Sequence, residues 1–268
     1  FGPARRGEAL GTFSSFSMVG RFSAPFLGGA LLYYTTFSSL YLTIGVSAAI
    51  ALALSFIVPW DEGGTGVQAK KFEGTMVAAL RNVLEERRIM LTSSMEAVQY
   101  FAMGAFETFL PVYMDQELGL TALEIGTVMG LQVVAMLLAK PFLGRLSDRW
   151  GRVPFIVTGL MLGAITIVLM PWTDDGMVLS MLSIGFGLTV ATVTASTSAL
   201  VTEIAGTSAH GSSIGVLSSI MDVGHSIGPF MTGIVVGTFS FTAGFGLAGA
   251  LLTMGAIVFA VGMRGHRK

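Results

Sequence analysis

Charged residues are scarce in this sequence, and cysteine is absent. Only 12% of the 268 residues are Asp, Glu, Lys or Arg, whereas soluble domains average about 25%, and this scarcity excludes a soluble enzyme. The 15 basic and 16 acidic residues leave a net charge of −1, without the basic surplus that binding to nucleic acid requires. Without cysteine there can be no disulfide, no thiolate chemistry and no cysteine-based metal site.

Hydrophobic residues, by contrast, make up 53% of the chain, which also excludes a disordered protein. They occur in blocks of about 20 or more residues, the length that a helix needs to cross a bilayer. A transmembrane β-barrel would instead show alternating segments of about 10 residues. We therefore predict an all-α, polytopic helical membrane protein with eight transmembrane helices. The predicted spans are 9–34, 39–60, 90–113, 121–144, 153–171, 176–204, 211–236 and 240–262.

Lys and Arg residues cluster near the two ends of the chain and in alternate loops. The clusters lie within 5–6, 70–88, 140–152 and 264–268, whereas the intervening loops carry acids and no base. Because basic loops stay on the cytoplasmic side, we expect these loops and both termini to be cytoplasmic. The expected location is a bacterial-type inner membrane.

The two ends of the chain resemble each other. Residues 7–29 (GEALGTFSSFSMVGRFSAPFLGG) and residues 211–233 (GSSIGVLSSIMDVGHSIGPFMTG) align without gaps and share nine identical positions. The offset corresponds to six spans, so both copies run in the same direction, as in parallel repeats of two six-helix halves. We expect the small residues and prolines of both copies to form helix-packing contacts. They are Gly20, Pro25, Gly28, Gly29, Gly224, Gly228, Pro229 and Gly233.

This repeat suggests how the chain is divided. Residues 1–60 would be the last two helices of an N-terminal half, 61–89 a cytoplasmic linker and 90–268 a C-terminal six-helix half. On this interpretation the sequence is the C-terminal part of a protein of about twelve spans, and we expect it to be inactive by itself. In the linker, apolar residues on one side predict an amphipathic helix at the membrane surface. They are Phe72, Met76, Leu80, Val83 and Leu84.

A polar motif lies between the spans 121–144 and 153–171. Residues 144–152 read GRLSDRWGR and resemble the cytoplasmic signature G-x-L-[SA]-D-R-x-G-R of the major facilitator superfamily of secondary transporters. The segment around Pro25 is similar to the glycine-proline motif of that family's antiporters, except that Ala24 replaces a glycine. The resemblance implies a helix bundle that works by alternating access and holds a small-molecule substrate between its two halves.

The motif also has a direct physical interpretation. Its two glycines allow a tight cytoplasmic turn, and its charged residues can form ion pairs across helix ends, with Glu203 as a partner. We interpret the motif as a latch between conformational states; a basic loop that only sets orientation is the alternative. The latch residues are Gly144, Asp148, Arg149, Gly151, Arg152 and Glu203.

Polar side chains inside the predicted spans 90–113 and 176–204 are candidate functional residues. Residues of span 90–113 that share one helix face predict a cavity wall: Glu96, Gln99, Tyr100, Met103 and Glu107. Glu107 could instead reach the membrane surface by snorkelling. For the hydroxyl groups of span 176–204, helix packing and substrate contact are both open. They belong to Thr189, Thr192, Thr194, Ser196, Thr197 and Ser198.

Span 211–236 carries a carboxylate and an imidazole near its middle. Asp222 and His225 are three residues apart on one helix face, which suits a proton relay; a structural polar pair is the alternative. Arg21 occupies the position of His225 in the repeat and cannot lose its proton. It must therefore face water, an anionic substrate or an acid such as Glu96 or Asp222.

These observations favour proton-coupled secondary transport of a small molecule by alternating access. The alternative is a non-transporting sensor or scaffold of the same architecture, or an inactive truncated product. No nucleotide-binding or hydrolase motif occurs, so we expect neither an enzyme nor an ATP-driven pump, and neither a cofactor nor a metal. The expected partners are the substrate, protons and the lipid bilayer, and no nucleic acid. We expect the full-length protein to be a monomer.

Overall fold

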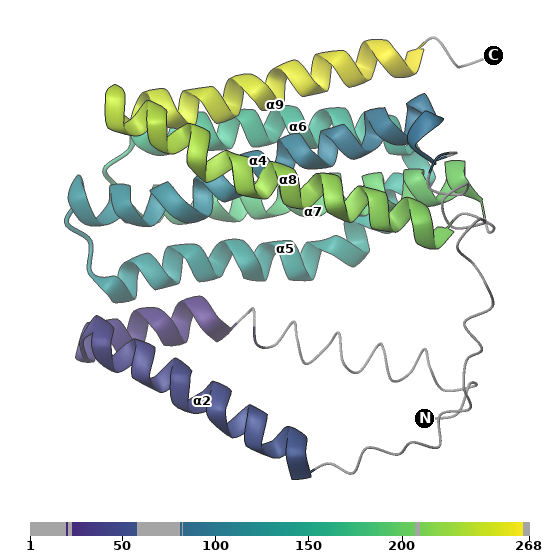
Figure 1. The fold of residues 1–268 in the computed structure, drawn as a ribbon. Coiled ribbons are helices and arrows are strands. Elements are labelled where there is room, and N and C mark those ends of the chain that lie inside the picture. Colours follow the sequence, from purple (N-terminus) through teal and green to yellow (C-terminus); the bar gives the residue numbers. More distant parts are fainter. Residues whose placement is uncertain (1–19, 21–22, 58–80, 82, 207–209, 265–268) are drawn as a thin grey trace.

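The computed structural model describes residues 20, 23–57, 81, 83–206 and 210–264. These residues form helices joined by short turns, and no strand occurs among them (Figure 1). The all-α, polytopic prediction is confirmed. Besides a helical segment at 23–34, called the first helix below, the elements are α2 (Phe37–Ile57), α4 (Arg87–Gln116), α5 (Ala122–Trp150), α6 (Arg152–Leu169), the 3-10 turn η2 (Met170–Trp172), α7 (Gly176–Ala205), α8 (His210–Thr238) and α9 (Phe241–Arg264).

Within this described part, five helices are long and apolar enough to cross a membrane. They are α2, α5, α6 with its 3-10 extension, α7 and α9. The helix α4 is equally long but carries Glu96 and Glu107 in its interior, which lowers its apolar character. The chain is therefore a helical membrane protein, and the total of eight spans stays a prediction.

Helices begin and end where side chains satisfy the free backbone groups. At the start of α5, the hydroxyl of Thr121 and the carboxylate of Glu124 form a capping box. At the start of α7, Asp175 accepts a hydrogen bond from the backbone N–H of Met177 (2.7 Å). At the other end of α7, Gly206 has a φ of +65°, a conformation that favours glycine.

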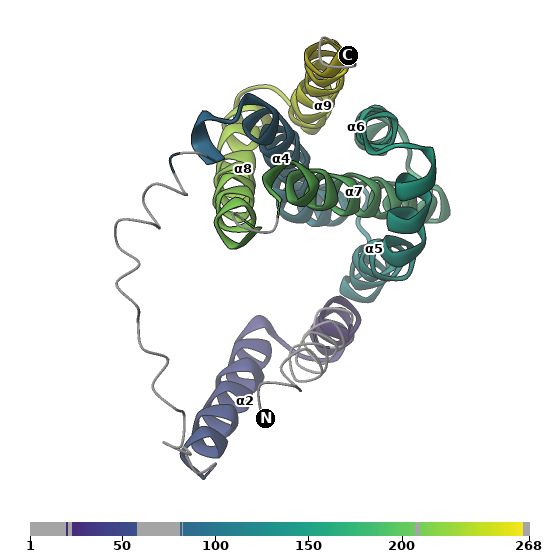
Figure 2. The same cartoon turned by 90° about the vertical axis from the view of Figure 1, so that its right-hand side faces the viewer.

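The helices α4 to α9 form a bundle in which α5 packs against α7, α8 against α4, and α6 against both α7 and α9 (Figures 1 and 2). The first helix lies beside α5, and α2 lies farther from α5 with nearly all of its residues exposed (Figure 2). The two ends of the bundle differ in the connections that they hold. The Gly151 end holds the α5–α6 and α7–α8 connections, and the Trp172 end holds the α4–α5, α6–α7 and α8–α9 connections.

Aromatic stacking and glycine contacts bring the helices close together. The rings of Phe106 and Phe186 stack across α4 and α7, with centroids 4.9 Å apart. On α8, a Cβ at Gly224 or Gly228 would collide with the carbonyl oxygen of Ala97 or Phe101 on α4. These two glycines therefore allow α4 and α8 to touch along their backbones.

The other predicted packing residues have different surroundings. A Cβ at Gly29 would lie 2.6 Å from the carbonyl oxygen of Ala122 on α5, and one at Gly233 would lie 3.1 Å from the ring of Phe109. The ring of Pro229 packs on Gly104. At Gly20 and Gly28, by contrast, nothing within the described part lies within 4 Å of a Cβ, so these two glycines form no such contact there. Of the apolar residues of the predicted linker helix, Phe72, Met76 and Leu80 lie outside the described residues, whereas Val83 is buried in the bundle and Leu84 is exposed.

The motif at 144–152 differs from its prediction. The helix α5 continues to Trp150, so most of the expected loop is helical, because no residue between Gly144 and Trp150 interrupts the backbone hydrogen bonds. The break is Gly151, with a φ of +97°, after which α6 begins directly. Lys140, which was grouped with the loop cations although it falls within the predicted span 121–144, lies inside α5.

Candidate functional site

Glu96 lies on the half of α4 nearer the Gly151 end and faces the inside of the bundle. Its side chain is 4% exposed, and its carboxylate accepts a hydrogen bond from the hydroxyl of Thr197 on α7. No basic side chain of the described residues forms a salt bridge with it. A charged carboxylate away from water is costly unless it is paired with a base. Glu96 is buried with a neutral hydroxyl as its partner, in an environment where carboxylates in general are paired or protonated.

The polar stripe of α4 continues inward from Glu96. Gln99 is fully buried, and neither atom of its amide has a hydrogen-bond partner within the described residues. A Cβ at Gly163 on α6 would lie 3.6 Å from the Gln99 carbonyl oxygen and 3.2 Å from the hydroxyl oxygen of Thr189. Met103 accepts from the amide of Gln132 on α5 at 3.5 Å. This part of the stripe is thus covered by other helices, whereas it was expected to line a cavity.

The outer part of the stripe meets α8. The His225 Nε2 lies 3.5 Å from the Glu107 Oε2, and both side chains are less than half exposed (43% and 42%). The ring of Tyr100 packs edge-on against the imidazole, with centroids 5.9 Å apart. The imidazole was expected to pair with Asp222 on its own helix. The structure places Glu107 against it, and Asp222 is exposed, because α8 turns His225 toward α4.

A cavity of about 850 Å³ lies between the first helix, α4 and α5 near the Trp172 end. Its volume is that of a drug-sized ligand site. Its wall is largely apolar, and among the described residues that line it there are two acids, Glu107 and Asp115, and no Lys or Arg. The other lining residues are Pro25, Gly29, Leu32, Thr35, Thr36, Phe37, Pro111, Val112, Gln116, Ala122, Ile125, Gly126 and Met129.

At the Gly151 end, Arg152 connects three helices. Its guanidinium forms ion pairs with Asp148 at the end of α5 (2.7 Å) and with Glu203 at the end of α7 (2.8 Å). The expected ion pair between the motif and Glu203 is therefore present in the structure. Arg149 is exposed, and no salt bridge joins it to another described residue. Arg21 lies outside the described residues.

The hydroxyl cluster of α7 divides into two groups. Thr189 and Thr192 donate to backbone carbonyls within α7, and Thr197 shares its one hydroxyl proton between the Val193 carbonyl and the Glu96 carboxylate. Thr194 and Ser196 are buried, and their hydroxyls have no hydrogen-bond partner in the described part of the chain. Packing within the helix thus accounts for the first group and not for the second.

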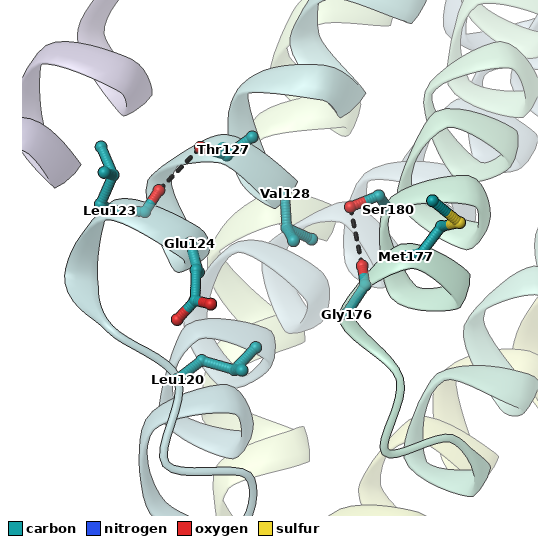
Figure 3. Close-up of a pocket in the computed structure, with 8 residues that line it drawn as sticks. All are labelled: Leu120, Leu123, Glu124, Thr127, Val128, Gly176, Met177 and Ser180. Atoms are coloured by element: carbon teal, nitrogen blue, oxygen red, sulfur yellow. Dashed lines mark hydrogen bonds between the residues drawn. The ribbon is translucent and has the colours of Figure 1, made fainter.

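A further hollow of about 540 Å³ lies between the starts of α5 and α7 (Figure 3). Its hydroxyls bond within their own helices, Thr127 to the Leu123 carbonyl (2.7 Å) and Ser180 to the Gly176 carbonyl (2.8 Å). The carboxylate of Glu124 is held by the backbone and hydroxyl of Thr121 (2.8 Å each). The charged group of this hollow is therefore committed to capping α5, and we assign the hollow no role.

Sequence reasoning missed Lys140 and Asp115 as residues of candidate sites. Lys140 lines a hollow next to α7 and was hidden because the basic motif was assigned to a loop. Asp115 lines the large cavity and was counted as an ordinary loop acid. A signal for Lys140 was present: the residue falls within the predicted span 121–144, and α5 continues through Pro141 and Gly144 to Trp150.

Long apolar helices that enclose a buried carboxylate toward one end and a drug-sized cavity toward the other are features of the transporter class of helical membrane proteins. A comparison with known protein families agrees with this assignment. The family model of the Major Facilitator Superfamily matches residues 92–268, which comprise α5 to α9 and nearly all of α4. The chain belongs to the major facilitator superfamily.

Curated relatives point to the same family. The chain is 28% identical over 155 residues to an uncharacterized MFS-type transporter of Methanocaldococcus jannaschii, covering 58% of this chain and 40% of the relative. It is 23% identical over 257 residues to the multidrug resistance protein MdtG of Salmonella arizonae, covering 94% and 63%. It is 26% identical over 152 residues to the quinolone resistance protein NorA of Staphylococcus aureus, covering 57% and 39%. The chain thus spans less than two thirds of the length of each relative.

Proposed function

We propose that the protein containing this chain is a proton-coupled secondary transporter that moves a small molecule by alternating access. Membership of the superfamily supports transport in general. The observation that carries proton coupling is the position of Glu96, which is 4% exposed and is bound by the hydroxyl of Thr197. The function needs no cofactor.

Glu96 can couple protonation to helix position. When the carboxyl is protonated it is neutral, and α4 and α7 can close around it without burying a charge. When it loses the proton it needs water or a cation, which favours a state in which α4 and α7 expose it. Loading and release of the proton would therefore shift the balance between two conformations.

Glu107 and His225 form a second proton-exchanging pair in this proposal. The two side chains lie 3.5 Å apart, and His is the side chain whose charge changes most readily near neutral pH. Glu107 also lines the large cavity, so a substrate bound there competes with the imidazole for its carboxylate. We propose this pair in place of Asp222 with His225.

The proposed substrate is an amphipathic cation. The described wall of the cavity is largely apolar and carries two carboxylates without a base, which suits a ligand that combines apolar surface with positive charge. The printed names of two relatives refer to multidrug and quinolone resistance, which supports an amphipathic substrate and export as the direction.

We also propose the division into two halves and the latch role of Arg152. The halves would be 1–60 and 90–268, joined by 61–89, and a family match that begins at residue 92 supports the second boundary. The ion pairs of Arg152 join the ends of α5 and α7 to the start of α6. Breaking and remaking them would accompany opening and closing at the Gly151 end.

Transport by Glu96→Gln tests the coupling. The protein is expressed from its native gene, and membrane vesicles with an imposed pH gradient take up radiolabelled tetraphenylphosphonium, an amphipathic cation. We expect gradient-driven accumulation to fall at least about tenfold, because the amide cannot exchange a proton, a loss that corresponds to about 1.4 kcal/mol. Exchange of external against internal tetraphenylphosphonium needs no net proton movement and should remain.

Two matched variants complete the test. Glu85→Gln removes an exposed acid near the Gly151 end and should change nothing. Glu107→Gln should weaken tetraphenylphosphonium binding as well as accumulation, because Glu107 lines the cavity. Undiminished accumulation in Glu96→Gln would exclude Glu96 from coupling. Absence of any flux in the unaltered protein would instead favour the sensor or scaffold alternative.

A further inference from the structure

A hollow of about 450 Å³, which we call the Tyr113 hollow, lies at the Trp172 end of the bundle (left in Figure 1). Its lining comes from the end of α4, the α6–α7 connection and the turn between α8 and α9. On α4, Tyr113 and Glu117 line this hollow, whereas Asp115 and Gln116 line the large cavity. The end of α4 therefore separates two sites that share no lining residue.

The Tyr113 hollow is acidic. Glu117 and Asp174 line it, and the described residues of its lining include no Lys, Arg or His. Neither carboxylate forms a salt bridge with another described residue. The three connections at this end of the bundle, 117–121, 173–175 and 239–240, also contain no Lys or Arg. The two negative charges therefore have no countercharge in the described part of the protein.

Helix ends add to this negative potential. Glu117 is the C-cap of α4, and Asp174 follows the 3-10 turn that ends at Trp172. Phe239, which also lines the hollow, directly follows the last residue of α8. The carbonyl groups at the C-terminal end of a helix carry partial negative charge, so an acidic side chain is unfavourable there and a cation is favourable. A bound cation would offset a repulsion that the sequence places at this end of the bundle.

Tyr113 contributes a buried polar group to the same hollow. The residue is only 6% exposed, and its ring packs edge-on against Phe241 and Phe245, with centroids 5.6 and 6.4 Å apart. Its hydroxyl forms no hydrogen bond with any residue that the structure describes. Leaving a buried hydroxyl unpaired is costly, and the hollow that Tyr113 lines has room for a partner. The position of this hydroxyl favours a ligand that donates a hydrogen bond.

We infer that the Tyr113 hollow is a binding site for a small alkylammonium ion of the diamine class, separate from the large cavity. The ammonium groups pair with the carboxylates of Glu117 and Asp174, and one N–H donates a hydrogen bond to the Tyr113 hydroxyl. The alkyl chain packs on the apolar part of the wall, which includes Phe239 and Phe241. Aromatic rings also attract a cation that lies over their faces.

The size and the donor set of the hollow favour an organic cation over a metal ion. A volume of about 450 Å³ lies within the range of small-molecule sites and is far larger than a bare ion requires. Among the described residues, no group of three His, Cys, Asp or Glu side chains could hold a metal ion. The inference does not depend on the proposed transport function.

Binding of cadaverine, a five-carbon alkyl diamine, tests the inference. The protein is expressed from its native gene and reconstituted in lipid nanodiscs, and binding is measured by titration calorimetry at constant ionic strength. We expect saturable binding of cadaverine and no binding of the diol of the same length, which lacks the charges. Glu117→Gln and Asp174→Asn should each weaken the affinity for cadaverine at least about tenfold, because each removes a charged hydrogen-bond acceptor.

Two matched variants separate this site from the large cavity and from a structural effect. Tyr113→Phe keeps the ring contacts and removes only the hydroxyl, so the affinity should fall roughly fivefold while the thermal unfolding temperature stays the same. Asp115→Asn removes an acid two residues from Glu117 that lines the large cavity. This variant should bind cadaverine at the Tyr113 hollow with unchanged affinity.

Several results would overturn the inference. They are the absence of saturable binding at millimolar cadaverine, equal binding of the diol, and displacement of cadaverine by Mg²⁺ at unchanged ionic strength, which would assign the hollow to a metal ion. Loss of binding in Asp115→Asn but not in Glu117→Gln would place the diamine in the large cavity. If Glu117→Gln fails to fold, Asp174→Asn answers the same question. These readouts need no transport, so they are independent of whether Glu96→Gln impairs it.

Discussion

Two carboxylates of one helix, Glu96 and Glu107, have opposite surroundings. Glu96 is closed in by α7 and bound by a hydroxyl, whereas Glu107 is 42% exposed, faces an imidazole and lines a cavity. Their shared helix face was predictable from spacing alone. Which half of that face is covered depends on where α7 and α8 cross α4. The same side chain therefore suits proton storage in one place and ligand contact in the other.

The charged residues at the Gly151 end are equally dependent on their neighbours. Arg152 is largely buried, with a side-chain exposure of 16%, while its partners Asp148 and Glu203 are about half exposed. Partly exposed ion pairs contribute about 0 to 1 kcal/mol to stability. These pairs are therefore weak enough to break and reform during a conformational cycle.

Asp148→Asn is the residue-scale prediction. Losing one of the two partners of Arg152 should reduce the rate of tetraphenylphosphonium transport at least about fivefold, the lower end of typical conformational coupling. Expression and the thermal unfolding temperature should stay near those of the unaltered protein, since one exposed ion pair contributes little to stability. Transport in vesicles and unfolding in detergent measure the two effects separately.

The comparison variant for this prediction is Glu85→Gln. It breaks the ion pair with Arg81 (2.7 Å), whose members are 77% and 61% exposed and lie one helical turn apart. This pair does not connect two different helices, so its loss should leave transport unchanged. Equal transport rates in Asp148→Asn and the unaltered protein would remove the latch assignment, and equal losses in both variants would show a general effect of charge.

At the scale of the helix, glycine contacts decide which elements approach closely. The helix α8 presents Gly224 and Gly228 to the α4 backbone, and the first helix presents Gly29 to α5. Closely packed glycines are typical of membrane helix interfaces, where small residues allow backbone contact. The sequence repeat predicts packing contacts at these positions. It also marked Gly20 and Gly28, which have open space around them in the described part, because a sequence pattern cannot show which side of a helix has a neighbour.

Gly224→Ala is the element-scale prediction. A methyl group there would collide with the backbone of Ala97, and neither helix can move without disturbing its other contacts. Overpacking of this kind costs about 1–3 kcal/mol, so the thermal unfolding temperature in detergent should fall by several degrees.

Gly215→Ala is its control on the same helix, because nothing lies within 4 Å of a Cβ at Gly215. This substitution should be neutral or slightly stabilising, since alanine favours a helix by up to about 1 kcal/mol over glycine. If Gly224→Ala unfolds at the same temperature as Gly215→Ala, the contact between α4 and α8 is looser than the structure shows.

Across the whole molecule, charge differs between the two ends of the bundle. The cavity near the Trp172 end is acidic, and the hollow near the Gly151 end contains Lys140 and Arg152. Basic residues next to membrane helices favour the cytoplasmic side. The Gly151 end is therefore predicted to face the cytoplasm, which places the acidic cavity toward the outer side of the membrane.

Cysteine labelling of two tryptophan positions tests this orientation. Trp150 and Trp172 lie at opposite ends of the bundle and are equally exposed, at 72% and 73%. In intact cells, a membrane-impermeant maleimide should label Trp172→Cys and not Trp150→Cys, and in inside-out vesicles the pattern should reverse. The absence of native cysteine keeps the background low. Labelling of Trp150→Cys in intact cells would reverse the predicted topology.

The sequence by itself determined the helical membrane class, the family resemblance and the candidate polar residues. Hydrophobic length, charge scarcity and motif spacing are local properties, and a bilayer converts them almost directly into helices because every backbone group must be satisfied internally. The positions of the helix ends were predicted less accurately. The helix α5 extends to Trp150, past the predicted loop, since a polar helix continues beyond the membrane until a residue such as Gly151 interrupts it.

Only the tertiary structure decided which polar side chains meet. His225 faces Glu107 and not Asp222, Glu96 meets Thr197, and Lys140 lies in a hollow beside Thr194. These pairings join residues on different helices, and they depend on the rotation and crossing of whole helices. Periodicity fixes the relative positions of residues on one helix, but it contains no information about the rotation of one helix against another, which packing of the complete bundle sets.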